Sequence, residues 1–352
     1  MPIYRSDMLW RYAQRVFAAA GSDGDVASRV ATALVDANLA GHDSHGVIRI
    51  PQYVDSVRAG EILPDARPMV VKETAVSALV DGGWGYGQVT AERATMEAVK
   101  RARVQGLSAV AAVRCNHIGR LGEYSEMAAR EGMIACVIAG GFGGEAAAAP
   151  FGGKTGLFGT NPLSFGFPAY GETAMLVDFA TTAVAAGKIR VARAKGASLP
   201  PGSILDRDGQ HTTNPEDFYH GGVMLPFGGH KGYALSMVVE LLGRVLTGAD
   251  SYAEGGRGGA VYGQSGTFVL AIDPTLFRDR GSYEQAVTET CDRVRAVPPA
   301  PGFDEVLVPG DPEARSRIQR QRDGIEVEQA TIDAILATAL SLGVTSDLVP
   351  VQ

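Results

Sequence analysis

The 352-residue sequence has few cysteines and histidines, and its charged residues carry no positive excess. The three cysteines (Cys115, Cys136 and Cys291) form no CxxC pair and leave an odd count. This argues against a disulfide framework and favours a reducing, cytoplasmic setting. The sequence has 32 basic and 39 acidic residues, so the net charge is −7. We therefore expect neither a general nucleic-acid binder nor a protein that binds anionic membranes.

Long hydrophobic runs are also missing. The first residues contain no apolar signal-peptide core. The longest uncharged stretch, residues 155–171, is rich in glycine and proline, and is shorter than the roughly 20 residues that span a bilayer. No membrane partner is expected.

Glycine is abundant instead: 45 of 352 residues, against a usual share of ~7%. Many tight turns and close backbone approaches follow from this. Apolar residues make up 45% and mean hydropathy is +0.03, which excludes a mainly disordered chain. The length suffices for one large core or for two to three smaller ones.

The periodicity of apolar residues changes twice along the chain. Residues 1–60 read as helices, strands alternate with helices from about residue 70, and helices return after residue 281. We expect an α/β domain over residues 71–284 and a helical domain built from both chain ends, residues 1–70 and 285–352. Expected helices cover residues 6–21, 25–40, 51–60, 88–105, 121–131, 231–246, 283–294 and 327–342. Expected strands cover residues 70–71, 78–80, 107–113, 133–139, 164–167, 174–179 and 267–272.

Two segments match nucleotide-binding motifs only in part. The strand at 133–139 leads into a glycine-rich segment, 141–146, that fits GxGxxA. Pro150 follows too soon for the helix that this fingerprint requires, and no acidic residue stands about 20 positions on. Residues 153–155 resemble the end of a Walker loop, but Ala148 replaces its first glycine. An ordinary Rossmann site and a P-loop are both disfavoured.

The segment 42–46, His-Asp-Ser-His-Gly, follows a helix stop and is the first chemical candidate. His45 can act as a general acid or base near neutral pH, with the hydroxyl of Ser44 as its relay. Arg49 is suited to hold a substrate carboxylate, and Tyr53 lies one turn further on. The alternative is that His45 is an ordinary surface histidine beside a helix, without a catalytic role. A metal site at His42 and His45 lacks a nearby third ligand.

Further candidates follow the later strands. Asn116 and His117 leave the strand at 107–113, where α/β proteins bind ligands, although Asn116 could instead cap a helix. Residues 158–162 and 177–182 form a third cluster, whose alternative reading is ordinary turn chemistry. Lys231 follows two glycines at the start of a helix, where phosphates bind, but it could equally be a surface lysine.

Together these clusters resemble the malate/L-lactate dehydrogenase family, which is unrelated to the Rossmann lactate dehydrogenases. That family also holds ureidoglycolate, sulfolactate and diketogulonate oxidoreductases and reductases of cyclic imino acids. The matching motifs, in order along the chain, are Asp43-Ser44-His45-Gly46-Val47-x-Arg49-x-Pro51-x-Tyr53, Asn116-His117-x-Gly119, Gly159-Thr160-Asn161-Pro162, Asp178-x-Ala180-Thr181, Gly187-Lys188, Leu225-Pro226-x-Gly228-Gly229-x-Lys231-Gly232 and Ala271-Ile272-Asp273-Pro274.

The resemblance implies a non-Rossmann α/β domain that binds NAD or NADP, a homodimer, and hydride transfer to or from C2 of a small 2-hydroxy or 2-oxo acid. It makes His45 and Ser44 the catalytic residues. We expect the substrate to bind at Arg49, Tyr53, His117 and Thr160. The residues expected to line the cofactor are His117, Ile118, Gly119, Arg120, Leu121, Asp178, Phe179, Ala180, His230, Lys231, Gly310, Asp311 and Pro312.

Two other interpretations of the sequence remain open, a reductase of cyclic 2-imino acids and a non-catalytic sensor. The turn at residues 226–232 is similar to the branch that reduces cyclic 2-imino acids, although that branch has an acidic residue where this chain has Lys188. The glycines at residues 140–144 also replace a Ser/Thr-Asn-Ser run of the family. A non-catalytic nucleotide or metabolite sensor is the alternative from another class, but a sensor has no need of the Ser44–His45 pair. The choice between NAD and NADP stays open, with Arg120, Lys188, Arg190 and Arg193 as candidates for a 2′-phosphate.

Overall fold

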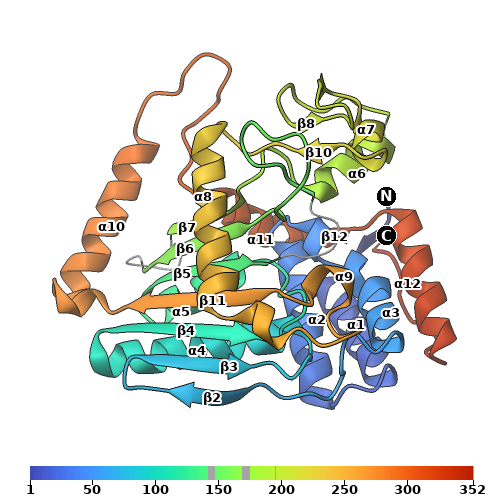
Figure 1. Cartoon of the computed structure of the whole chain (residues 1–352), viewed down its shortest axis with the longest axis horizontal. Helices are drawn as coiled ribbons and strands as arrows, with labels where there is room; N and C mark the ends of the chain where they lie inside the picture. The colour runs from blue at the N-terminus through green and yellow to red at the C-terminus, as the bar shows by residue number, and fades with distance from the viewer. Residues whose placement is uncertain (142–146, 169–174, 195, 352) are drawn as a thin grey trace.

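A computed structural model of the chain describes every residue except 142–146, 169–174, 195 and 352. Part of the glycine-rich segment at 141–146 and the first residue of the strand expected at 174–179 therefore lie outside the described residues. The structure is a mixed α/β fold around a seven-stranded sheet, which confirms the predicted fold class (Figure 1).

The central sheet is mostly antiparallel. Within the described parts of the chain, one neighbouring pair, β3 with β4, is parallel and the other five pairs are antiparallel. This differs from the parallel sheet of a Rossmann domain. The strand order is β2 (Met69–Glu73), β3 (Ser77–Asp81), β4 (Leu107–Val113), β11 (Gly266–Ile272), β5 (Ile134–Gly140), β6 (Pro162–Phe167) and β7 (Met175–Ala180).

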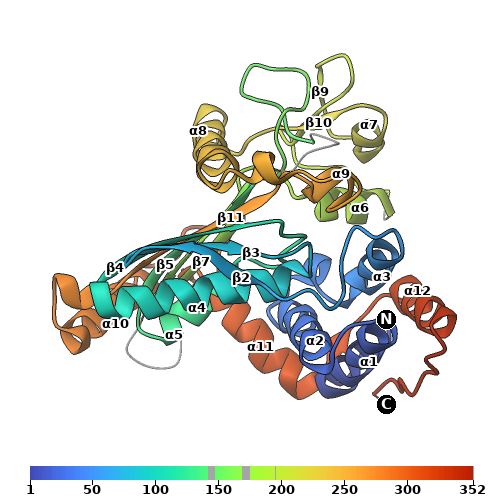
Figure 2. The ribbon, with the colours of Figure 1, turned by 60° about the horizontal axis from the view of Figure 1, so that its bottom comes forward.

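Helices cover both faces of this sheet. Figure 2 shows α4 (Gly87–Gln105) and α5 (Gly122–Arg130) on one face and α8 (His230–Glu240) on the other. The sheet-facing side of α4 carries alanines at helical spacing, which let the helix approach the strands closely. Gly106 ends α4 with a φ of +82°, and this left-handed turn sends the chain directly into β4.

The two chain ends share a second core. Helices α1 (Ser6–Ala19), α2 (Gly24–Leu39) and α3 (Ile50–Arg58) bury their apolar faces together with α12 (Gln329–Ser341). The short strands β1 (Ile3–Tyr4) and β12 (Ile325–Glu326) pair antiparallel, and both termini lie beside this core (Figures 1 and 2). The division of the chain at residues 70 and 285 stays a prediction.

Several elements differ from expectation. The first helix, expected to reach residue 21, ends as α1 at Ala19. The helix expected at 231–246 ends as α8 at Glu240 and continues as a wider π-helical segment, η3 (Leu241–Leu246), where Gly243 crosses closely over Gly140. Helix α11 (Asp311–Asp323) was not expected, because it has almost no apolar periodicity.

The remaining elements are short or lie outside the central sheet. They are η1 (Asp43–His45), η2 (Val47–Arg49), α6 (Ala186–Ala194), β8 (Ile204–Leu205), β9 (His211–Thr212), α7 (Pro215–Tyr219), β10 (Val223–Met224), η4 (Ala249–Tyr252), α9 (Gly259–Tyr262), η5 (Pro274–Leu276) and α10 (Arg280–Arg295). Within the described ranges, no helix is long and apolar enough to cross a membrane.

Candidate active site

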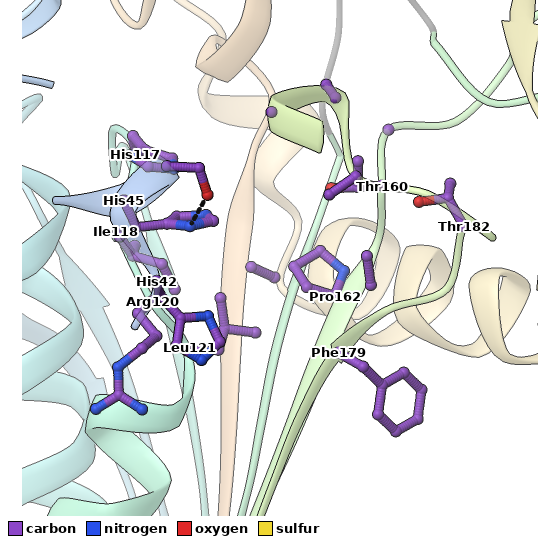
Figure 3. A pocket seen from close by; sticks show the side chains of 18 of the residues that line it. His42, His45, His117, Ile118, Arg120, Leu121, Thr160, Pro162, Phe179 and Thr182 are labelled. Carbon is purple, nitrogen blue, oxygen red and sulfur yellow. Dashed lines mark hydrogen bonds between the residues drawn. The ribbon is translucent and has the colours of Figure 1, made fainter. Parts of the chain in front are cut away.

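A cavity of about 740 Å³ lies between the helical core and the sheet, within the range typical of small-molecule sites. His45 and Arg120 lie on one side of it, and Thr160, Thr182 and Phe179 lie on the other (Figure 3). The family resemblance gives catalytic, substrate-binding or cofactor-lining roles to eighteen residues, of which twelve line the cavity: Ser44, His45, Arg49, His117, Ile118, Gly119, Arg120, Leu121, Thr160, Asp178, Phe179 and Ala180.

Six others do not line the cavity. Tyr53 is buried directly behind His117. His230 and Lys231 are exposed on the first turn of α8. Residues 310–312 form the start of α11, where the Asp311 carboxylate binds the guanidinium of Arg295 at 2.7 and 3.0 Å. The cofactor contacts expected of these α8 and α11 residues stay predictions.

The catalytic candidate His45 ends the short 3₁₀ turn η1, and Ser44 holds its ring. The Ser44 Oγ lies 3.0 Å from Nδ1 of His45, drawn as the dashed line in Figure 3. This contact occupies Nδ1, so Nε2 is the nitrogen that can meet a substrate. The expected pairing of Ser44 with His45 is present in the geometry.

Burial, together with the positive charge of Arg49 and the proximity of His42 and Arg120, lowers the pKa of His45 to about 3. At neutral pH the ring is therefore uncharged. A neutral imidazole with its Nε2 lone pair available is suited to accept a hydroxyl proton.

Two hydrogen bonds hold the ring of His117 from behind. The Gln88 amide nitrogen donates to Tyr53 Oη at 2.8 Å, and Tyr53 Oη lies 2.6 Å from His117 Nδ1. Burial holds the pKa of His117 well below its usual value, so the ring is neutral at neutral pH. With the Tyr53 hydroxyl donating to Nδ1, the ring hydrogen is on Nε2, where it can be donated to a ligand in the cavity.

The loop that carries His117 is fixed from behind. Asn116 is buried, and its side-chain amide donates to the carbonyls of Trp84 and Gly85 at 3.1 and 3.0 Å. A Cβ at Gly87 would lie 2.2 Å from the Asn116 carbonyl, so glycine lets the start of α4 approach this loop. Asn116 therefore anchors a turn, and the alternative of a helix cap is wrong.

Arg49 is partly engaged within the protein. Its Nε donates to the Ser44 carbonyl at 2.6 Å and its Nη1 to Gln52 Oε1 at 2.6 Å. These bonds fix the guanidinium beside the catalytic pair and leave Nη2 for a carboxylate.

Arg120 supplies a second cation, with a side chain only 1% exposed. Its Nη2 donates to Asp36 at 3.1 Å and to Glu126 at 3.3 Å. Its Nε and Nη1 are buried with no hydrogen-bond partner among the described residues. Both atoms are shielded from solvent, so Arg120 acts on the cavity mainly through its positive charge.

Asp178 is the carboxyl group on the same wall. It accepts from the backbone N–H of Gly122 at 2.7 Å. Burial raises its pKa, while the neighbouring Arg120 opposes that rise. A cation beside a carboxyl group suits the phosphates and ribose hydroxyls of a dinucleotide.

Part of the cavity wall carries no recognisable signal in the sequence. Tyr262 on α9 has its ring 5.5 Å from that of His117, and Val261 and Ser265 also line the cavity. They belong to a glycine-rich stretch without periodicity, which hides them from sequence analysis. Within the described ranges, no cluster of histidine, cysteine and acidic residues could hold a metal ion.

The chain is similar to known proteins over nearly its whole length. Residues 5–336 match the family described as malate/L-lactate dehydrogenase. The L-sulfolactate dehydrogenase of Methanothermobacter thermautotrophicus is 38% identical over 327 residues, 91% of each chain. Among solved structures, sulfolactate dehydrogenase of Methanocaldococcus jannaschii superposes with a TM-score of 0.87 (33% identity, 97% of this chain and 98% of that one). Delta1-piperideine-2-carboxylate reductase of Pseudomonas syringae pvar. tomato superposes with a TM-score of 0.84 (31% identity, 96% and 100%).

Proposed function

The chain belongs to the malate/L-lactate dehydrogenase family, and from that membership we propose that it transfers a hydride between NAD or NADP and C2 of a small 2-hydroxy acid. The observation that carries this proposal is the contact of Ser44 Oγ with His45 Nδ1 at the wall of the cavity, which leaves Nε2 of His45 for a substrate. A sensor protein would need no such proton acceptor.

Different side chains of the cavity have different roles in the proposed reaction. In the oxidative direction the substrate hydroxyl donates its proton to His45 Nε2, while His117 Nε2–H donates to the substrate oxygen. Arg49 Nη2 binds the carboxylate and fixes C2 in place. The bound nicotinamide accepts or supplies the hydride. Arg120, Asp178 and the 118–121 segment are the residues that would hold that cofactor.

The charge of the cavity supports an acid with two negative groups. Among the residues that the structure describes, Arg49, Arg120, Lys188 and Arg190 line it against one carboxyl group, that of Asp178. The start of α6 lies at the catalytic end, since a Cβ at Gly187 would sit 2.9 Å from Ser44 Cβ. Lys188 and Arg190 are therefore placed to attract a second anionic group, as in malate or sulfolactate.

Reduction of a cyclic 2-imino acid is the second candidate. It is favoured by the likeness to the piperideine-2-carboxylate reductase structure. A protonated imine is a cation, however, and the excess of arginine and lysine around this cavity opposes it.

One panel tests these alternatives. Oxidation of NADH and of NADPH is followed with pyruvate, oxaloacetate, sulfopyruvate, diketogulonate and piperideine-2-carboxylate. We expect the largest kcat/KM with a doubly charged 2-oxo acid. Turnover confined to piperideine-2-carboxylate would establish the second candidate. Cofactor binding without turnover of any compound would favour the sensor.

We also propose a cytoplasmic homodimer, as the family resemblance and the free cysteines support. Sedimentation equilibrium at micromolar concentration tests the oligomeric state, and a monomer would refute it.

A further inference from the structure

Asp43, the residue before the catalytic pair, is held by two side chains from other helices. Arg320 of α11 donates from Nη1 to Oδ1 at 2.6 Å and from Nη2 to Oδ2 at 3.0 Å. Asn38 of α2 donates from Nδ2 to the same Oδ1 at 2.6 Å. Arg320 also binds the Asn38 carbonyl at 2.5 Å, which ties the three residues into one cluster.

Asn38 also holds the other end of the loop. Its Oδ1 accepts from the backbone N–H of Val47 at 2.8 Å, and its side chain is buried. A Cβ at Gly46 would lie 2.2 Å from that oxygen, so the chain reaches Asn38 only because residue 46 is glycine. The loop 43–47 therefore wraps around one asparagine side chain.

The backbone of this loop contributes little rigidity of its own. The 3₁₀ turn η1 has three residues, with bonds from His45 N to the His42 carbonyl and from Gly46 N to the Asp43 carbonyl. Such short turns have poor hydrogen-bond geometry. Ser44 and His45 consequently depend on the side chains that hold Asp43 and Val47.

The ion pair is better suited to positioning than to stability. The Asp43 side chain is 52% exposed, and exposed ion pairs add little to the free energy of unfolding. Their effect on geometry is larger, because a displacement of about 1 Å in a catalytic group can cost about 100-fold in rate.

We propose that Arg320 is a positioning residue that acts through Asp43 and Asn38 to fix the Ser44–His45 pair, an inference that rests on the proposed dehydrogenase function. Arg320 lies 275 residues after His45, on the helix that sequence periodicity missed. Its contribution is to keep the Ser44 Oγ within hydrogen-bonding distance of His45 Nδ1.

Helix α11 offers a matched control. Arg315 makes a two-point ion pair with Glu305, with Nη2 to Oε2 at 2.8 Å, on the same helix but away from the loop. We expect Arg320→Gln to lower kcat about 10–100-fold with an unchanged dissociation constant for NAD(P)H and an unchanged melting temperature. Arg315→Gln should leave all three unchanged.

Chemical rescue provides a readout that loss of stability would not produce. Guanidinium ions at millimolar concentration should restore part of kcat to Arg320→Ala and none to His45→Ala. Equal kcat for Arg320→Gln and Arg315→Gln, in an active wild-type enzyme, would overturn the inference.

The proposed function fails separately, since it requires that the wild type turn over a 2-oxo acid. If the wild type is inactive, the ¹⁵N shifts of the His45 ring decide the inference. They should change in Arg320→Gln and not in Arg315→Gln, and unchanged shifts in both variants would overturn it.

Discussion

The imidazole ring of His45 stacks on that of His117, with ring centroids 5.6 Å apart and planes 18° apart. The two rings reach this arrangement from loops 72 residues apart in the sequence. Ser44 engages Nδ1 of the first ring and Tyr53 engages Nδ1 of the second. Both Nε2 atoms are thereby left for one substrate, and in the proposed reaction the second ring is the donor and the first is the acceptor.

Removing the Tyr53 hydroxyl should disturb the tautomer of His117. In Tyr53→Phe, the ring loses the hydrogen that holds Nδ1 as an acceptor, and the Gln88 amide loses its partner. We expect kcat to fall about 10-fold and the free energy of unfolding to fall by about 1–3 kcal/mol. Stopped-flow kinetics and urea unfolding measure the two effects. Tyr86→Phe, which removes a longer 3.4 Å contact to Ser22, is the control; equal effects in both variants would contradict the assignment.

Loss of the His45 imidazole should affect the proton transfer itself. We expect His45→Ala to lower kcat by about 10²–10⁴-fold, the usual contribution of general acid–base catalysis. The dissociation constant for NAD(P)H, measured by fluorescence quenching, should stay unchanged. Near-normal turnover would remove His45 from the mechanism.

The lowered pKa of His45 also predicts a pH-dependent stability. An unfolded histidine has a pKa of about 6.5, whereas the folded value is about 3. Between these values the unfolded state binds one proton more, so the free energy of unfolding decreases as the pH falls from about 6.5 towards 3. The slope is at most about 1.4 kcal/mol per pH unit, and less because one edge of the ring faces the cavity.

Urea unfolding between pH 6 and pH 4 measures this slope. His45→Gln should have a shallower dependence than the wild type by up to one proton. His211→Gln, at an exposed position on β9, should match the wild type. Identical slopes in all three proteins would show that His45 titrates normally in the folded state.

The local sequence pattern predicts those elements whose own residues mark where they begin and end. Strand β4 was predicted at its observed bounds, because Gly106 marks the turn before it and apolar residues fill it. The insertion of β11 between β4 and β5 could not be predicted, since its partners lie more than 120 residues earlier. Strand pairing at such separation leaves no trace in local periodicity.

The candidate site also combines contacts that the sequence predicts with contacts that only the fold produces. Ser44 and His45 are neighbours in sequence, so their pairing was foreseeable. The hydrogen bond between Tyr53 and His117 joins residues 64 positions apart, and only the fold brings them together. Helix α11 escaped prediction because its arginines and acids bind other side chains rather than filling a core.

Lys231 tests the expected cofactor contact outside the cavity wall. It lies on the first turn of α8, after Gly229, where helix N–H groups and its ammonium can meet a phosphate. We expect Lys231→Ala to raise the dissociation constant for NAD(P)H about 10–100-fold, the value of a charge-assisted hydrogen bond, with a smaller change in kcat than in His45→Ala. The control variant Lys154→Ala, at an exposed position, should leave the dissociation constant for NAD(P)H unchanged. Unchanged affinity in Lys231→Ala would identify a surface lysine.

Lys188 should strengthen the binding of substrates that carry a second negative charge. It is exposed at the rim of the cavity, directly after Gly187, which lies against Ser44. In Lys188→Ala we expect the KM for oxaloacetate to rise about 5-fold, the value of roughly 1 kcal/mol for a solvent-exposed ion pair. The KM for pyruvate, which has no second carboxylate, should stay the same.

Salt dependence and a control on the same helix complete this test. Raising the ionic strength from 0.05 to 0.5 M should shrink the difference between wild type and Lys188→Ala, because screening weakens an exposed ion pair. Arg193 also lies on α6 but binds Glu216 at 2.7 Å, so Arg193→Ala should leave both KM values unchanged. A parallel rise in KM for oxaloacetate and pyruvate would place Lys188 near the shared 2-oxo carboxylate, and a rise in the dissociation constant for NADPH alone would place it at the cofactor 2′-phosphate.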